Sequence, residues 1–159
     1  MIRFQTEQTI DRPAQDIWTY AADITRHPEW MGVIDARLVS ERATDIGARG
    51  VERTKLGPRT FEVGLEVSES IPAQRIAWRM DGGSPFIGEV TLDLESLGPE
   101  STRAVWSGGI GLTGWWRLIE PLIATKVRAG EAAELRRLKE RLESAAASAS
   151  ASTGEPATS

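Results

Sequence analysis

Two ionisable side chains could move protons in the apolar interior of this protein. Glu52 lies in a stretch, residues 49–55, that reads as a strand, and His27 is the single histidine of the chain. A carboxyl group held on the apolar face of a sheet is desolvated, which favours uptake of a proton and suits a general base. Glu52 is therefore the one catalytic candidate, and it becomes one only if its side chain points inward.

Each of these residues also has a plainer interpretation. A bulge could turn Glu52 outward, or the carboxylate could form an ion pair with Arg79 or Arg103 at the rim of the sheet; we favour this rim position. His27 directly precedes Pro28, and we read it as a surface turn residue rather than as an acid, a base or a ligand. A rim position for Glu52 favours a binding protein, whereas an inward Glu52 with no arginine partner favours an enzyme.

The composition excludes several other chemistries. The chain has no cysteine and a single histidine, which excludes disulfides and thiol catalysis and argues against a transition-metal site. No Ser-His-Asp set is available, because the single histidine is assigned to a turn. We therefore expect no metal and no cofactor.

The elements that must position these side chains follow from the hydrophobic pattern. Alternation of apolar and polar residues predicts strands, and short Gly- or Pro-containing turns between them predict an antiparallel meander with one wet face. Two short helices are expected between the first strand and the second, near residues 13–22 and 23–30. The predicted strands are residues 2–10, 33–41, 49–55, 60–71, 74–81, 86–97 and 102–111.

The hairpin at Gly57-Pro58 allows the inner face to be derived by parity. If only these two residues form the loop, Glu52 lies opposite Val63 and Thr54 lies opposite Phe61, which puts all four on the apolar face. A three-residue loop would reverse this orientation. Trp78 and Trp106 share the same face, and we expect a cavity of a few hundred Å3 beneath them.

A long helix over residues 114–144 is expected to cover this face. Its first half is apolar nearly all round, and Pro121 and Gly130 predict a kink or a change of direction. Its second half interleaves Arg or Lys with Glu from Glu134 to Glu143, which predicts a solvated face. The candidate ligand-binding residues are Tyr20, Trp30, Thr54, Phe61, Val63, Trp78, Met80, Val90, Trp106, Trp115, Leu118 and Leu122.

Length and charge set the remaining limits. The 159 residues suit one domain, residues 1–143, followed by a tail over residues 144–159 that is rich in Ser and Ala and is predicted to be disordered. The net charge of −4 argues against nucleic acid and against anionic membrane surfaces as partners. No apolar run is long enough for an integral membrane segment, and the first residues lack a secretory pattern, so we expect a cytoplasmic protein. No feature indicates a homodimer, although the oligomeric state stays open.

Several local patterns carry a resemblance to a known family. They are Arg12-Pro13 at a helix start, Asp23 with His27-Pro28 and Trp30, Glu69 with Pro72 and Ile76-Ala77-Trp78, and Leu135 with Leu138-Lys139 and Leu142. The chain resembles the START-like, or helix-grip, superfamily, and within it the bacterial polyketide cyclase/dehydrase-like (SRPBCC) branch. The resemblance covers about residues 2–143. It implies an α+β fold in which an antiparallel sheet of about six to seven strands curves around the C-terminal helix and leaves a cavity.

Three functions follow from this interpretation. The leading one is binding of a small, mostly apolar, lipid- or polyketide-like molecule in the cavity between sheet and helix. The alternative is an enzyme similar to polyketide cyclases and dehydratases, in which Glu52 moves a proton. The third is a protein-interaction module, which would show an exposed apolar patch in place of a cavity. Whether the chain is an enzyme stays open at this point.

Overall fold

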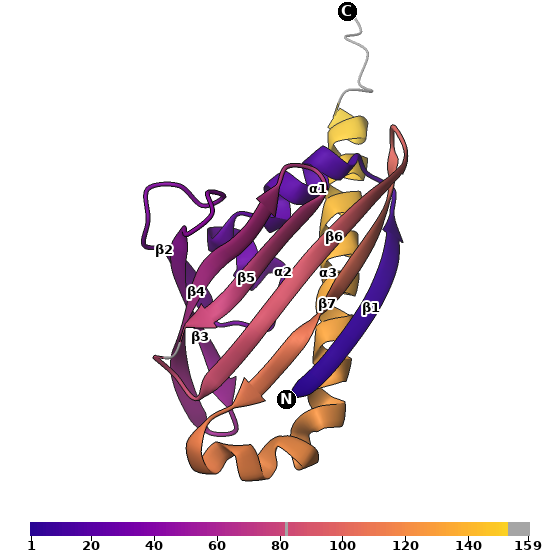
Figure 1. Cartoon of the computed structure of the whole chain (residues 1–159). Helices are drawn as coiled ribbons and strands as arrows, with labels where there is room; N and C mark the ends of the chain where they lie inside the picture. The colour runs from indigo at the N-terminus through magenta and orange to yellow at the C-terminus, as the bar shows by residue number, and fades with distance from the viewer. Residues whose placement is uncertain (82, 153–159) are drawn as a thin grey trace, which may run out of the picture.

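The computed structural model describes residues 1–81 and 83–152. Seven strands form one antiparallel sheet in the order β1-β7-β6-β5-β4-β3-β2 (Figure 1). Strands β2 to β7 thus form a meander, and β1 pairs with the last strand, β7. The sheet confirms the predicted α+β class. The strands are β1 (Ile2–Ile10), β2 (Asp35–Leu38), β3 (Arg49–Leu56), β4 (Arg59–Ile71), β5 (Arg75–Asp81), β6 (Phe86–Gly98) and β7 (Ser101–Leu112).

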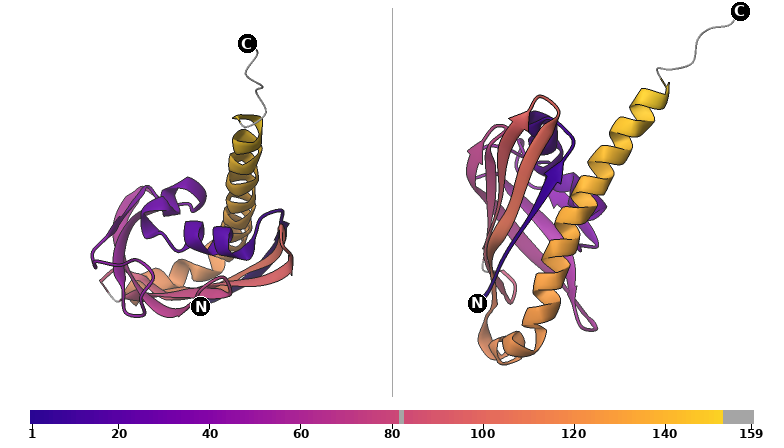
Figure 2. Two further views of the ribbon diagram at one scale, coloured as in Figure 1. Left: turned by 90° about the horizontal axis from the view of Figure 1, so that it is seen from above. Right: turned by 90° about the vertical axis from the view of Figure 1, so that its right-hand side faces the viewer.

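The helices all lie on one side of this curved sheet (Figure 2). Three short ones separate β1 from β2, and the 3-10 helix η2 turns the chain from β7 into the long helix α3. These helices are α1 (Ala14–Ala21), η1 (Ile24–Arg26), α2 (His27–Trp30), η2 (Gly114–Ile119) and α3 (Glu120–Ser152). Together they confirm the helix-grip arrangement, in which the sheet wraps around the C-terminal helix.

The core lies between the concave face of the sheet and the second half of α3. Leu135, Leu138 and Leu142 are the buried leucines of α3, and they pack in one cluster with the inner residues of the strands. Trp78 and Trp106 belong to the same cluster and are fully buried. The amphipathic second half of the helix therefore holds α3 on the sheet, because burial of each large apolar side chain contributes about 1.5–3 kcal/mol.

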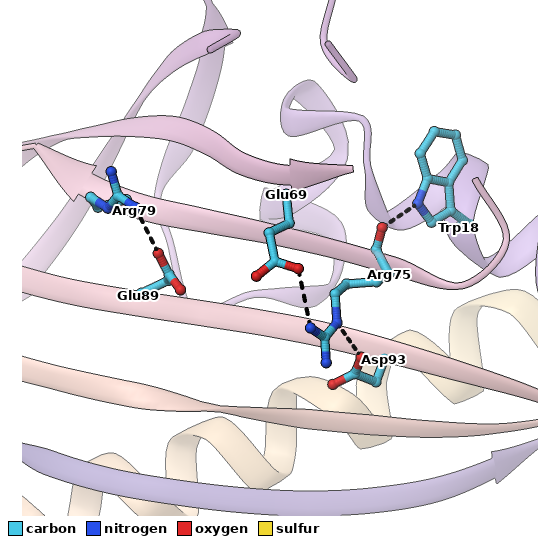
Figure 3. A network of polar contacts seen from close by, with 6 residues as sticks. All are labelled: Trp18, Glu69, Arg75, Arg79, Glu89 and Asp93. Atoms are coloured by element: carbon cyan, nitrogen blue, oxygen red, sulfur yellow. Dashed lines mark hydrogen bonds and ion pairs between the residues drawn. The ribbon is translucent and has the colours of Figure 1, made fainter. Parts of the chain in front are cut away.

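The convex face of the sheet is polar and carries cross-strand ion pairs (Figure 3). Arg75 on β5 bonds Glu69 at 3.1 Å and Asp93 at 2.6 Å, and Arg79 bonds Glu89 at 3.4 Å. These contacts follow from the alternation of the strands, which sends every second side chain to solvent. The same picture shows Trp18 of α1, whose indole N–H donates to the Arg75 carbonyl at 3.1 Å and ties the helix to the start of β5.

The β3–β4 hairpin has the two-residue loop that the parity argument required. Leu56 pairs with Arg59 across Gly57 and Pro58, and Thr54 pairs with Phe61. Gly57 adopts a φ of +61°, in the left-handed region that a tight turn demands of its first loop residue. The register that orients Glu52 is therefore the predicted one.

Element boundaries differ from the predictions in three places. β2 is shorter than residues 33–41 and has only four residues. The expected kink lies before Pro121, in the 3-10 turn of η2, and α3 then runs through Gly130 without interruption. α3 also continues to Ser152, beyond its expected end near 144; of the predicted disordered tail, residues 153–159 lie outside the described residues. Within the described part of the chain, no helix is both long and apolar enough to cross a lipid bilayer.

Candidate functional site

A cavity of about 640 Å3 lies between the concave face of the sheet and the first half of α3. Its floor on the sheet side is formed by inward residues of β3 to β7, because alternate residues of each strand point to the same face. The two tryptophans expected above a void, Trp78 and Trp106, both line it. The predicted cavity is thus confirmed, and its volume falls within the usual range for ligand pockets.

The segment that runs from η2 into α3 contributes a different apolar stripe from the predicted one. Ile119, Ile123 and Val127 line the cavity at intervals of four residues, together with Trp116. The prediction that Trp115, Leu118 and Leu122 cover the sheet is wrong, since these three side chains are exposed. The segment has apolar residues of its own on every side, so their periodicity could not show which side faces the sheet. The 3-10 turn of η2 also advances about 120° per residue instead of about 100°, which shifts the face that reaches the sheet.

The other candidate ligand-binding residues divide into two groups. Tyr20, Trp30 and Phe61 are not among the residues that line the cavity. Tyr20 donates a hydrogen bond to Glu29, Trp30 is buried against Trp106 with ring centroids 5.6 Å apart, and Phe61 packs edge-on against Trp116 at 5.6 Å. The residues that line the cavity are Thr54, Val63, Trp78, Met80, Val90 and Trp106.

The cavity reaches the surface between the β3–β4 hairpin tip and the start of α3. Lys55 and Arg59 of the hairpin and Lys126 of the helix belong to its lining and are exposed. The Arg59 guanidinium lies over the Trp116 ring, 5.8 Å from its centroid, and connects the two sides of this mouth. The mouth is therefore cationic, whereas the walls behind it are apolar.

Glu52 and His27 meet at the cavity wall. Both side chains line the cavity, both are buried, and His27 Nδ1 contacts Glu52 Oε1 within hydrogen-bonding distance. His27 Nε2 lies 3.1 Å from the Ala21 carbonyl oxygen, which can only accept, so Nε2 carries a hydrogen. One further proton is then shared between Nδ1 and the Glu52 carboxylate. The pair thus holds a proton within reach of the cavity.

Both favoured interpretations of these residues were wrong. Glu52 is not at the rim, and the arginines proposed as its partners are engaged elsewhere, Arg79 with Glu89 and Arg103 with Glu7 and Glu95. His27 is not a surface turn residue. The Asp23 carboxylate accepts from the Thr25 N–H at 3.0 Å and caps η1, and the one-turn helix α2 then places the imidazole against Trp30 and Trp78.

Two further carboxyl groups project from α3 toward the same region. The Trp106 indole N–H donates to Glu131 at 2.8 Å, and the Gly32 N–H donates to Glu134 at 2.7 Å. Burial raises the pKa of Glu131 to about 7, although the hydrogen bonds that it accepts from Trp106 and Glu134 oppose the shift. Burial, and next the nearby charge of Glu131, raise the pKa of Glu134 well above its usual range.

Neither glutamate was selected from the sequence, and the prediction of a solvated charged face is wrong for Glu134. The rest of that run is mostly exposed, but Arg137 donates to the Trp30 carbonyl at 2.8 Å and Arg141 to the Glu29 carbonyl at 3.1 Å, which fixes α3 to α2. The available signal was spacing: Glu134 precedes Leu138 by four residues and Leu142 by eight, so the buried leucine stripe passes through it.

The polar groups of the site form a small cluster in an apolar cavity. The indole N–H of Trp78, fully buried, has no hydrogen-bond partner among the described residues. Within residues 1–81 and 83–152, no group of three or more His, Asp or Glu side chains is arranged to hold a metal ion. The arrangement can bury an apolar body and offer it a shared proton at His27–Glu52 and carboxyl groups at Glu131 and Glu134.

Comparisons with known proteins agree with this geometry. Residues 1–143 match the family described as polyketide cyclase / dehydrase and lipid transport. No curated protein matches the chain.

Solved structures of low sequence identity share the fold. A Thermus thermophilus protein superimposes with a TM-score of 0.74 at 18% identity, covering 90% of this chain and 98% of that one. A START superfamily protein from Mycobacterium smegmatis gives 0.74 at 14% identity, with coverages of 89% and 97%. The Zhui aromatase/cyclase from a Streptomyces species gives 0.71 at 14% identity, with coverages of 89% and 93%.

Proposed function

This chain belongs to the polyketide cyclase / dehydrase and lipid transport family, and we propose that it binds a small, mostly apolar, lipid- or polyketide-like molecule in its inner cavity. The observation that carries the proposal is the cavity of about 640 Å3 lined by Trp78, Trp106, Val90 and the Ile119–Ile123–Val127 stripe. Apolar walls of this kind bind by excluding water, and a few polar groups orient the ligand. The cluster at Glu52, His27 and Glu131 supplies those polar groups.

The test is to fill the cavity and measure binding. We expect an uncharged, environment-sensitive apolar dye to bind the protein and to be displaced by extracts or by long-chain apolar compounds. Val127→Trp should project an indole into the cavity and weaken dye binding at least about tenfold, which corresponds to a loss of about 1.4 kcal/mol. Ala129→Trp, on an exposed position of the same helix, is the matched control and should bind dye as the parent does.

Native mass spectrometry of freshly purified protein adds an independent reading. A co-purifying molecule in the parent, absent from Val127→Trp and present in Ala129→Trp, would identify the ligand. If both tryptophan variants bind dye as strongly as the parent, the cavity is not the binding site and the proposal fails.

The second candidate is a cyclase- or dehydratase-like enzyme that uses the same cavity. The observation that favours it is the inward, arginine-free Glu52 with His27 as its partner. In this role the cavity folds a flexible chain so that reacting atoms are close together, and the shared proton of the pair moves to or from the bound molecule. Glu131 and Glu134, protonated more readily than ordinary glutamates, would donate hydrogen bonds to a carbonyl oxygen.

Conservative substitution separates the two candidates once a ligand is in hand. For the enzyme, Glu52→Gln should abolish turnover and leave ligand affinity within a few fold, because the amide keeps the shape but cannot exchange the proton. For the binding protein, no turnover is present to lose, and only affinity is compared. Conversion of the bound ligand by the parent and by Glu52→Gln at equal rates would exclude a catalytic role for this pair.

A further inference from the structure

The side of η2 and of the start of α3 that points away from the cavity carries three exposed apolar side chains. Trp115, Leu118 and Leu122 are 61%, 79% and 82% exposed, and their spacing of three and then four residues puts them on one side of the chain as η2 passes into α3. Isolated exposed apolar residues are ordinary, but a contiguous group within eight residues marks an interaction surface. This group borders the cavity mouth.

Basic side chains surround this apolar group. Arg117 lies between Trp115 and Leu118 in sequence and is exposed, and exposed Arg59 and Lys126 flank the mouth itself. The nearest carboxyl group in the sequence, Glu120, is occupied, because it accepts from the N-terminal ammonium at 2.8 Å and from the Leu112 N–H at 2.6 Å. The surface is therefore cationic, although the whole chain has a net charge of −4.

We propose that the mouth surface, defined as Trp115, Leu118 and Leu122 with Arg59, Arg117 and Lys126, docks onto an anionic lipid bilayer. Tryptophan and leucine side chains insert at the boundary between headgroups and acyl chains, and Arg and Lys pair with anionic headgroups beside them. This is the combination that the surface presents. The net charge, which argued against membranes from the sequence, conceals this uneven distribution.

A second copy of the chain fits the surface less well. A two-fold contact is self-complementary, so it would bring the same surface of each copy together. Arg59, Arg117 and Lys126 would then face their own counterparts, and the like charges would repel. An anionic bilayer satisfies both the apolar and the cationic parts of the surface.

Docking in this orientation would place the cavity opening against the bilayer. The mouth lies between the tip of the β3–β4 hairpin, Gly57-Pro58, and the turn of η2. Figure 2 shows the hairpin and η2 at the end of the molecule that is opposite the C-terminal end of α3. An apolar ligand would then pass between membrane and cavity without crossing water. The docking itself does not depend on which ligand the cavity holds.

The experiment is vesicle co-sedimentation with the full chain. We expect partitioning onto vesicles of phosphatidylcholine mixed with phosphatidylglycerol, little onto phosphatidylcholine alone, and a steep loss in ~0.5 M NaCl, where the Debye length falls to about 4 Å. The triple variant Trp115→Ser/Leu118→Ser/Leu122→Ser and the charge variant Arg59→Glu/Arg117→Glu/Lys126→Glu should each weaken partitioning at least about tenfold.

The matched control removes exposed apolar side chains elsewhere. Val39 and Ile46 are 61% and 71% exposed and lie before the start of β3, at the end of the strand opposite the hairpin. Val39→Ser/Ile46→Ser should partition as the parent does. Circular dichroism of all variants should match the parent, since every altered side chain is at the surface.

Three outcomes overturn the proposal. In the first, the parent does not partition onto anionic vesicles at low salt. In the second, the parent and both mouth-surface variants partition equally. In the third, the parent forms a dimer, and the substitutions Trp115→Ser/Leu118→Ser/Leu122→Ser dissociate it. The last result would assign the surface to self-association.

Discussion

The His27 imidazole and the Glu52 carboxylate form a buried hydrogen-bonded pair that joins α2 to β3 across the cavity wall. The ring is also held at its other nitrogen by the Ala21 carbonyl and packs edge-on against Trp78, with ring centroids 5.1 Å apart. Every polar atom of the imidazole therefore has a partner within the chain. The pair is thus a structural contact that also forms part of the cavity lining.

Removing the acceptor should destabilise the fold. Glu52→Leu leaves His27 Nδ1 buried without a partner, and we expect a loss of about 1–3 kcal/mol in the free energy of unfolding, measured by urea denaturation. Glu52→Gln keeps an oxygen in place and should lose less. Glu62→Gln, at an exposed position of the neighbouring strand, should change stability by less than about 0.5 kcal/mol. Equal stability of Glu52→Leu and the parent would show that the contact contributes nothing.

Stability should depend on pH through Glu131. Its pKa is raised to about 7 in the folded protein from an ordinary 4.5, so the folded state binds a proton that the unfolded state releases. The protein therefore loses stability as pH rises from about 4.5 to 7, and Glu131→Gln, which cannot ionise, should gain about 1–3 kcal/mol relative to the parent over that interval.

The difference between the two denaturation curves reports the removal of this one carboxyl group, because every other residue is the same in both proteins. The charge of Glu131 helps to raise the pKa of Glu134, so Glu131→Gln lowers the pKa of Glu134 and thereby adds to the gain in stability. A difference that stays constant from pH 4 to 8 would contradict the raised pKa.

Two glycines should respond oppositely to alanine. At Gly50 on β3, an added Cβ would lie 2.8 Å from Ile24 Cδ1 and 3.1 Å from the Arg37 carbonyl oxygen, so Gly50→Ala should destabilise by about 1–3 kcal/mol through overpacking. At Gly130, within α3, nothing lies within 4 Å of the added atom. Gly130→Ala should stabilise by about 0.5–1 kcal/mol, since alanine favours the helix. Thermal melts of the two variants provide the comparison, and a destabilised Gly130→Ala would mean that the helix bends there.

The end of the chain should be dispensable. Leu142 is the last fully buried residue of α3, and of the residues after 144 that the structure describes only Ala146 is half-buried. Deletion of residues 145–159 should therefore leave the melting temperature unchanged within about 2 °C, whereas Leu142→Ala should cost about 2–5 kcal/mol. A clear loss of stability in the deletion would show that this segment docks on the domain.

Sequence reasoning succeeded where the period of the strands is strict. The two-residue loop at Gly57-Pro58 fixed the parity of β3 and β4 and indicated an inward position for Thr54 and Glu52, although we had favoured a rim position for Glu52. The same alternation put Trp78 and Trp106 over one cavity. A strand has only two faces, so one correct register orients every residue on it.

Sequence reasoning failed where both sides of a helix carry large apolar residues. In the stretch from Trp115 to Val127, the stripe through Ile123 and the stripe through Leu122 both contain large apolar residues, and the tertiary packing decides between them. His27 was missed for a different reason: a residue before proline resembles a turn, and its burial depends on a single turn of helix that contacts distant strands. The local sequence pattern shows neither which side of the helix packs on the sheet nor that His27 contacts distant strands.

The six tryptophans are divided by their surroundings into groups with different optical behaviour. Trp30, Trp78 and Trp106 are fully buried and in ring contact, whereas Trp115 and Trp116 stack at 3.9 Å beside the mouth, with Trp115 exposed. Buried indoles emit at shorter wavelength than hydrated ones, so the two groups occupy opposite ends of one emission band. A molecule entering the cavity would perturb the short-wavelength end, and contact at the mouth would move the long-wavelength end toward the blue. The chain thus carries its own pair of spectroscopic reporters, one for the interior and one for the entrance.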